Sequence, residues 1–147
     1  MNILVDTNIL LQWFDHTSPD HELCRAAVQR TIDDGGTAYV NPQVCVEFWA
    51  VGTKTQKANG FGFDTDRAEE GLVAIRAYFE ILDATPAVFD TWRDLVVRHD
   101  VRGVNTYDAR VAASMITHNV PRLVTFNLKD FRRYGLDATD PSSLAGG

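Results

Sequence analysis

The chain has 147 residues, enough for one domain with a sizeable hydrophobic core. Hydrophobic residues make up 45% and charged residues 23%, a composition that excludes a disordered or a membrane-embedded chain. No apolar run approaches the length of a transmembrane helix, and the first residues lack the basic region of a secretory signal, so we expect a cytoplasmic protein without a membrane partner.

The charges are unevenly distributed along the chain. The net charge of -6, taken alone, argues against a nucleic-acid partner. Residues 91–133, however, contain eight Lys and Arg against four Asp, which gives this segment +4 and leaves -10 for the remainder. Such a basic stretch is either a binding surface for phosphates or an ordinary solvated surface, and the sequence leaves both interpretations open.

Short strand-like segments alternate with longer helical ones. Strands are expected at residues 3–5, 37–40, 80–84, 123–125 and 135–138. Helix starts are expected at Thr7, Ser18–Pro19, Asn41–Pro42, Thr85–Pro86 and Thr106, with a long helix after the loop at 57–66 and a turn or short helix at 127–134. This alternation predicts an α/β fold with a mostly parallel sheet flanked by helices. In such sheets, ligands bind at the carboxyl ends of the strands.

Three acidic residues are candidates for a functional site, and two of them lie in apolar segments. Asp6 interrupts the apolar run ILVDTNILLQW at the end of the first strand, and Glu47 lies in the apolar helix segment VCVEFWAV. Asp108 falls in the first turn of the helix that Thr106 is expected to open. Each has an ordinary explanation: a helix cap for Asp6, an exposed helical position for Glu47, and a favourable helix start for Asp108.

Considered together, the three acids point to a metal. Carboxylates gathered in one cleft raise the pKa values of one another, and a hard divalent cation such as Mg²⁺ or Mn²⁺ relieves that repulsion. The four histidines are scattered, which argues against zinc. We therefore expect Asp6 to be a metal ligand at the edge of the core that is not itself buried.

Other chemistries have weaker support. The chain contains no GxxxxGK[ST] loop, no GxGxxG after the first strand and no GxSxG nucleophile motif. A phosphoaspartyl phosphatase, with Asp6 as nucleophile, stays as an alternative. Such enzymes resemble DxD at this point, whereas the residue two after Asp6 is Asn8.

Four segments together resemble the PIN-domain ribonucleases, most closely the VapC-type toxins of type II toxin–antitoxin pairs. These segments are VDTNIL at 5–10, the helical Glu47, YDARVAAS at 107–114 and LVTFNLKDF at 123–131. The resemblance implies a single PIN domain over residues 1–147, a PIN-like sandwich with a central mostly parallel sheet. Its structured core would cover about residues 1–138, with a C-terminal tail at 139–147.

The resemblance also implies a metal-dependent endoribonuclease site. By position, Asp6, Glu47 and Asp108 are the catalytic metal ligands for Mg²⁺ or Mn²⁺, and Asn8 and Thr125 orient the carboxylates. Asn127 matches a fourth position that is often Asp in the family, and Asp130 three residues later is the other candidate. The expected reaction is hydrolysis of RNA by a water that the metal activates, leaving 5′-phosphate and 3′-hydroxyl ends. Candidates for contacts with the RNA backbone are Arg93, Arg98, Arg102 and Arg110.

The implied partners are the RNA substrate, a cognate antitoxin protein and a second copy of the chain in a homodimer. An apolar groove for an antitoxin helix could be formed by Trp13, Phe14, Phe48, Trp49, Phe61 and Phe63. The alternative function is a PIN-like module that binds RNA or protein without cutting. Three converging acids argue against that alternative, because a binding module does not need them.

Overall fold

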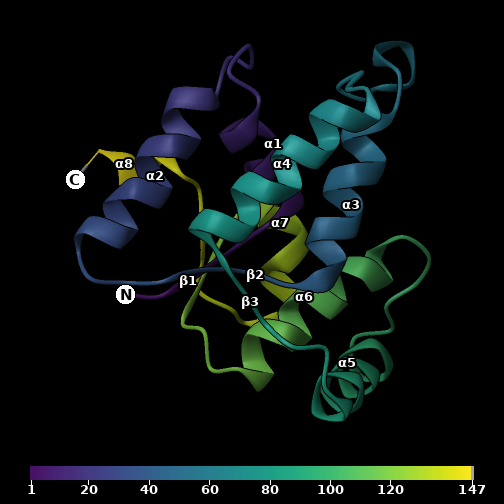
Figure 1. Ribbon diagram of the computed structural model, residues 1–147. Coiled ribbons are helices and arrows are strands. Elements are labelled where there is room, and N and C mark those ends of the chain that lie inside the picture. Colours follow the sequence, from purple (N-terminus) through teal and green to yellow (C-terminus); the bar gives the residue numbers. More distant parts are fainter. Residues whose placement is uncertain (147) are drawn as a thin grey trace.

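A five-stranded parallel sheet forms the centre of the computed structural model, which describes residues 1–146 (Figure 1). The strands are β1 (Ile3–Val5), β2 (Ala38–Val40), β3 (Glu80–Ile81), β4 (Arg122–Val124) and β5 (Ala138–Thr139), in the order β3-β2-β1-β4-β5. Every neighbouring pair is parallel. The predicted α/β fold with a mostly parallel sheet is confirmed.

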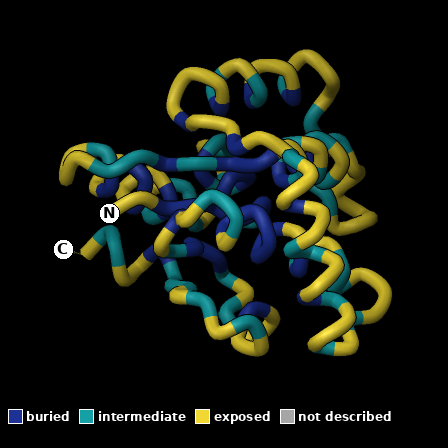
Figure 2. The backbone as a smooth tube through the Cα atoms, turned by 90° about the horizontal axis from the view of Figure 1, so that it is seen from below, coloured by how far each residue is buried: buried dark blue, intermediate teal, exposed yellow. Residues whose placement is uncertain are grey.

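Helices cover the sheet. They are α1 (Thr7–Phe14), α2 (His21–Asp33), α3 (Pro42–Thr53), α4 (Thr65–Tyr78), α5 (Pro86–Arg98), α6 (Asn105–Thr117), α7 (Leu128–Phe131) and α8 (Ser142–Ala145). Buried backbone is concentrated in the interior, and the outer sides of the helices are exposed (Figure 2). Within residues 1–146, no helix has the length and apolar character needed to cross a membrane.

The central strand β1 places Asp6 at the carboxyl end of the sheet. Ile3, Leu4 and Val5 are completely or almost completely buried because β1 lies between β2 and β4 and has helices on its faces. Asp6 follows as the N-cap of α1, and its Oδ1 accepts the backbone N–H of Thr7 at 2.8 Å. This confirms the interpretation of Asp6 as a helix cap, and the expected cap at Thr7 was wrong.

Two other predicted helix starts differ from the structure. α2 begins at His21 with Asp20 at the N-cap position, two residues beyond the predicted Ser18–Pro19 start. α6 begins at Asn105, and the hydroxyl of Thr106 donates to the carbonyl of Gly103 at 2.8 Å in place of capping the helix. Asp108 nevertheless lies in the first turn of α6, as predicted.

The end of the chain is more ordered than the predicted tail at 139–147. Thr139 belongs to β5, which pairs with β4, and α8 packs against α2. Leu144 on α8 is partly buried against the main core, which explains why this short segment is held in place. Residue 147 lies outside the described residues.

Candidate metal centre

Four carboxylates from four elements share one neighbourhood. Asp6 follows β1, Glu47 lies on α3, Asp108 is in the first turn of α6, and Asp130 is on α7 after β4. The negative charges of Glu47 and Asp130 raise the pKa values of both Asp6 and Asp108. The structure thus brings together the three acids singled out in the sequence, and adds Asp130.

Asp6 is the most constrained of the four. It is only 5% exposed, so the expectation that it would not be buried was wrong. Burial raises the pKa of its carboxyl, hydrogen bonds from Thr125 and Thr7 oppose this, and the charges of Glu47 and Asp130 add to it. The carboxyl tolerates burial because it caps α1 and accepts further hydrogen bonds at its other oxygen.

Asn8 and Thr125, the residues expected to orient a carboxylate, both contact Asp6. The Thr125 hydroxyl donates to Oδ2 of Asp6 at 2.8 Å, and the Asn8 side-chain amide donates to the same atom at 3.5 Å. Thr125 in turn accepts the backbone N–H of Asn127 at 3.0 Å, and Asn8 Oδ1 accepts that of Phe126 at 3.3 Å. These bonds fasten the Asp6 carboxylate to the segment that follows β4.

Glu47 has a donor on each carboxylate oxygen. The hydroxyl of Thr7 donates to Oε2 at 2.8 Å, and the side-chain amide of Gln43 donates to Oε1 at 2.9 Å. Thr7 therefore bonds two of the acids, since its backbone N–H donates to Asp6. The sequence patterns indicated a helix start at Thr7 but no role at the acidic centre for either Thr7 or Gln43. The helical i, i+4 spacing of Gln43 and Glu47 is the signal that would have found the second contact.

The surroundings of Asp108 raise the pKa of its carboxyl group. Burial, followed by the charges of Asp6, Asp130 and Glu47, raises its pKa to about 7, while the Arg133 guanidinium acts in the opposite direction. Arg133 is thus the cation whose charge acts on this acid. Arg133 is the last residue of the basic segment 91–133, and nothing in the sequence pattern indicated a role for it at the acidic centre.

Asn127 and Asp130 occupy different places relative to the other acids. The Asn127 side chain is exposed, and its backbone N–H binds Thr125. Asp130 is also exposed, yet its charge acts on both Asp6 and Asp108. Of the two candidates for the fourth position, Asp130 is the one that contributes negative charge.

The site has carboxylate oxygens but lacks paired cations. Among residues 1–146, none of the four acids forms an ion pair with Lys, Arg or His. In the same part of the chain, no three His, Cys, Asp or Glu side chains are arranged closely enough to hold a metal ion. A carboxylate oxygen that accepts one hydrogen bond retains a second lone-pair direction. The oxygen-only donor set and its negative charge, which Arg133 offsets only in part, fit a hard divalent cation such as Mg²⁺ or Mn²⁺.

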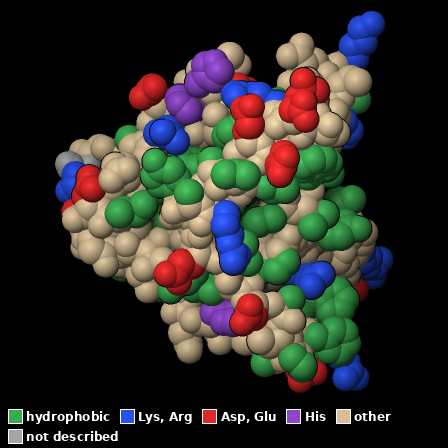
Figure 3. Space-filling model, in the orientation of Figure 1, with side chains coloured by type: hydrophobic (Ala, Val, Ile, Leu, Met, Phe, Trp, Pro, Cys, Tyr) green, Lys and Arg blue, Asp and Glu red, His purple; other side chains and the backbone are tan. Residues whose placement is uncertain are grey.

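The four predicted RNA-contact arginines are exposed on α5, on α6 and on the loop between these helices. Arg98 pairs with Asp94, and Arg102 pairs with Asp100 at 2.9 Å, both at exposed positions. Arg110 lines a cavity of about 370 Å³ with Phe89 and Trp92 of α5. Arg93 lines a separate surface depression on α5. On the face shown in Figure 3, basic side chains are scattered among acidic and apolar ones and form no continuous stripe.

The predicted apolar groove is largely filled by the protein itself. Trp13 and Phe48 are 2% and 0% exposed, so their assignment to a partner-binding groove was wrong; both belong to the core. Of the remaining members, Phe14, Trp49, Phe61 and Phe63 are partly buried.

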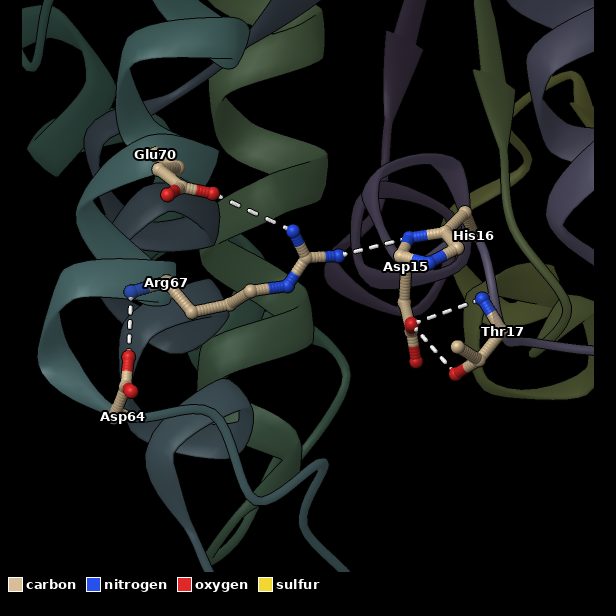
Figure 4. Close-up of polar contacts among 6 residues, drawn as sticks. All are labelled: Asp15, His16, Thr17, Asp64, Arg67 and Glu70. Atoms are coloured by element: carbon tan, nitrogen blue, oxygen red, sulfur yellow. Dashed lines mark hydrogen bonds and ion pairs between the residues drawn. The ribbon is translucent and has the colours of Figure 1, made fainter.

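Arg67 of α4 covers part of this aromatic cluster. Its guanidinium lies 4.5 Å from the ring centroid of Phe14 and 5.7 Å from that of Phe63. The same group contacts Nδ1 of His16 at 3.1 Å and pairs with Glu70 at 3.4 Å, so that it bridges α4 and the segment after α1 (Figure 4). The Arg67 side chain thus covers the predicted groove at Phe14 and Phe63.

These features define an α/β protein with an acidic centre at the carboxyl edge of a parallel sheet. The family model described as PIN domain matches residues 3–136, and the chain therefore belongs to the PIN domain family. The resemblance inferred from the sequence motifs is confirmed, as is the PIN-like form of the fold. No curated protein matches the sequence of this chain.

Several solved structures share this fold. VapBC2 from Rickettsia felis, bound to a DNA fragment from its promoter, is 19% identical, with 95% of this chain and 98% of that chain covered and a TM-score of 0.69. Mycobacterium tuberculosis VapC20, described as a sarcin–ricin loop cleaving toxin, is 20% identical over 91% and 95% of the two chains, with a TM-score of 0.66. FitAcB from Neisseria gonorrhoeae is 15% identical over 95% and 97%, with a TM-score of 0.62. VapC-type toxin structures are thus among the structural neighbours of this chain.

Proposed function

We propose that this chain is a Mg²⁺- or Mn²⁺-dependent endoribonuclease that acts as the toxin of a toxin–antitoxin pair. The observation that supports this most is the group of four carboxylates of Asp6, Glu47, Asp108 and Asp130, which raise pKa values within the group and have no paired cation among residues 1–146. A surface that only binds a partner does not need several carboxylates close together, because their mutual repulsion opposes that arrangement.

The residues have distinct roles in this proposal. Asp6 and Asp108 hold the ion, Asp130 is the preferred fourth ligand over Asn127, and Glu47 either shares the ion or takes the proton of the attacking water. When bound, the ion supplies Lewis acidity and neutralises charge on the phosphodiester. Thr7, Asn8 and Thr125 keep the carboxylates of Asp6 and Glu47 in place through the hydrogen bonds described above.

The proposed partners follow from the similar structures. VapBC and FitAB structures, together with one described as a toxin–antitoxin complex from Klebsiella pneumoniae, share the fold of this chain. We propose that this chain likewise binds a cognate antitoxin. As a separate proposal, implied by the family resemblance, it forms a homodimer. We propose an RNA substrate from the PIN-domain family and from the similarity to VapC20, which is described as a sarcin–ricin loop cleaving toxin.

The decisive experiment is a cleavage assay on single-stranded RNA with the purified protein. We expect cleavage with Mg²⁺ or Mn²⁺, none with EDTA, recovery when Mn²⁺ is added back, and 5′-phosphate ends on the products. Asp6→Asn should abolish cleavage, whereas Asp66→Asn, an exposed acid in the first turn of α4, should leave it unchanged. RNA binding without cleavage in Mg²⁺, in Mn²⁺ and in EDTA alike would show instead a non-cutting binding module.

A further inference from the structure

Gln43 connects two of the helices that carry the acidic centre. It lies in the first turn of α3, one turn before Glu47. Its side-chain nitrogen donates to Oε1 of Glu47 at 2.9 Å and to the backbone carbonyl of Tyr107 at 2.8 Å. Tyr107 immediately precedes Asp108, so one amide group spans from the carboxylate of one acid to the backbone beside another.

The chemistry of its two partners fixes the orientation of this amide. Both partners, a carboxylate oxygen and a carbonyl oxygen, are acceptors, and only the NH₂ end of a glutamine can donate to them. The opposite orientation would place the amide oxygen against two other oxygens. In the orientation observed, Oε1 of Gln43 is buried and accepts no hydrogen bond from residues 1–146. Gln43 therefore leaves one of its own polar atoms unpaired while both of its donors are used.

The start of α6 depends on such contacts from outside. Val104 occupies the N-cap position and provides no side-chain cap. Two other helices bond carbonyls of this first turn: Trp92 of α5 donates to the carbonyl of Thr106 at 3.0 Å, and Gln43 of α3 donates to that of Tyr107. The Gln43 bridge thus links the Glu47 carboxylate to the turn that bears Asp108.

The two acids repel each other, so this position has to be enforced. Both side chains end in a carboxyl group, and two carboxylates held in one neighbourhood favour separation because like charges repel. Thr7 holds the other oxygen of Glu47 but, within residues 1–146, forms no side-chain hydrogen bond to α6. We propose that Gln43 is a positioning residue of the acidic centre, which holds the Glu47 carboxylate and the α6 turn bearing Asp108 in one arrangement.

Two substitutions test this proposal, which rests on the proposed nuclease function for its activity readout alone. Gln43→Leu removes both donors at similar size, and Gln43→Asn keeps the amide but shortens the reach by one methylene. The matched control is Gln12→Leu, because Gln12 on α1 also has a buried, unpaired Oε1 but bonds none of the four acids. Mn²⁺ affinity is measured by calorimetry without RNA, and kcat and KM are measured with RNA, at temperatures where circular dichroism shows each variant folded.

We expect Gln43→Leu to bind Mn²⁺ about tenfold more weakly and to lose about tenfold or more in kcat, with KM for RNA little changed. Gln43→Asn should lie between this variant and the wild type, and Gln12→Leu should match the wild type in both measurements. A merely structural role would lower the melting temperature and leave the Mn²⁺ affinity of the folded protein unchanged.

Wild-type Mn²⁺ affinity in Gln43→Leu would overturn the proposal; should that variant not fold, wild-type affinity in Gln43→Asn would do so. An equal loss in Gln12→Leu would also overturn it. If the wild type cuts no RNA under any condition, the proposed function fails, but the comparison of Mn²⁺ affinities still decides the role of Gln43.

Discussion

The Thr125 hydroxyl donates a hydrogen bond to Oδ2 of Asp6 at 2.8 Å, across 119 residues of sequence. This bond joins the ends of β1 and β4, the two neighbouring strands that bring Asp6 and the α7 segment together. Both residues are buried, so the bond is shielded from competition by water.

Replacing Thr125 by valine should impair the site more than the fold. The change keeps the shape but removes the donor to Asp6, and we expect a loss of about 1–3 kcal/mol in the free energy of unfolding and a 10- to 100-fold loss of RNA cleavage. Thr31→Val is the matched control, because the buried Thr31 hydroxyl bonds the Ala27 carbonyl at 3.1 Å on α2. Denaturant unfolding and cleavage rates check both; equal cleavage losses in the two variants would contradict the role given to Thr125.

The stability of the metal-free protein should fall as the pH rises. The pKa of Asp108 is raised from 3.8 to about 7 on folding, so between these values the folded state binds more protons than the unfolded state. The free energy of unfolding therefore decreases from about pH 4 to pH 7, and Asp6, whose pKa is raised as well, acts in the same direction.

Asp108→Asn should remove the Asp108 part of this dependence. In EDTA at pH 8 we expect this variant to be more stable than the wild type by about 1–2 kcal/mol, a value reduced for solvent screening of a partly exposed group. At pH 4 the two proteins should be nearly equal. Urea unfolding at both pH values is the measurement, and a variant that is less stable than the wild type at pH 8 would contradict the raised pKa.

Divalent metal should reverse this destabilisation. An ion that binds only the folded state stabilises it by mass action, about 2.7 kcal/mol at a concentration of 100 times Kd. Thermal unfolding should show a higher Tm with Mn²⁺ than with EDTA in the wild type, and no such increase in Asp6→Asn. A similar rise in both proteins would indicate that Mn²⁺ binds elsewhere.

Asp130 and Asn127 can be separated by substitution. Because the charge of Asp130 acts on both Asp6 and Asp108, we expect Asp130→Asn to weaken Mn²⁺ binding about tenfold and to lower the pKa of Asp108. Asn127→Ala should change either quantity much less. Calorimetry for the metal and carboxyl-detected NMR titration for the pKa provide the test, and the reverse ranking would assign the fourth position to Asn127.

The order of strands and helices could be predicted because each has a strong local pattern. The ILV run before Asp6 and the apolar spacing of α4 and α5 are visible in the sequence alone. Helix starts were less accurate, since the polar residues at Ser18 and Thr106 suggest caps that the backbone does not use. The tail was mispredicted because α8 is too short to show a period and is held by packing on α2.

At the site, the candidate acids could be identified from the sequence, but their contacts with other side chains could not. Asp6, Glu47 and Asp108 stood out because acids are unusual in their positions, but nothing local reveals that Thr125 allows Asp6 to be buried. The effect of Arg133 on Asp108 likewise depends on how α7 and the residues after it return to the sheet. Trp13 and Phe48 were assigned to a groove because sequence does not distinguish a core aromatic from an exposed one.

The central claim is that these carboxylates form a divalent metal centre, and the most direct test is an anomalous difference map from a crystal of the protein soaked in Mn²⁺. We expect a peak within about 2.0–2.3 Å of carboxylate oxygens of Asp6 and Asp108, with the side chains of Glu47 and Asp130 beside it. A fully soaked crystal with no peak there, or with its strongest peak bound to other residues, would contradict the account.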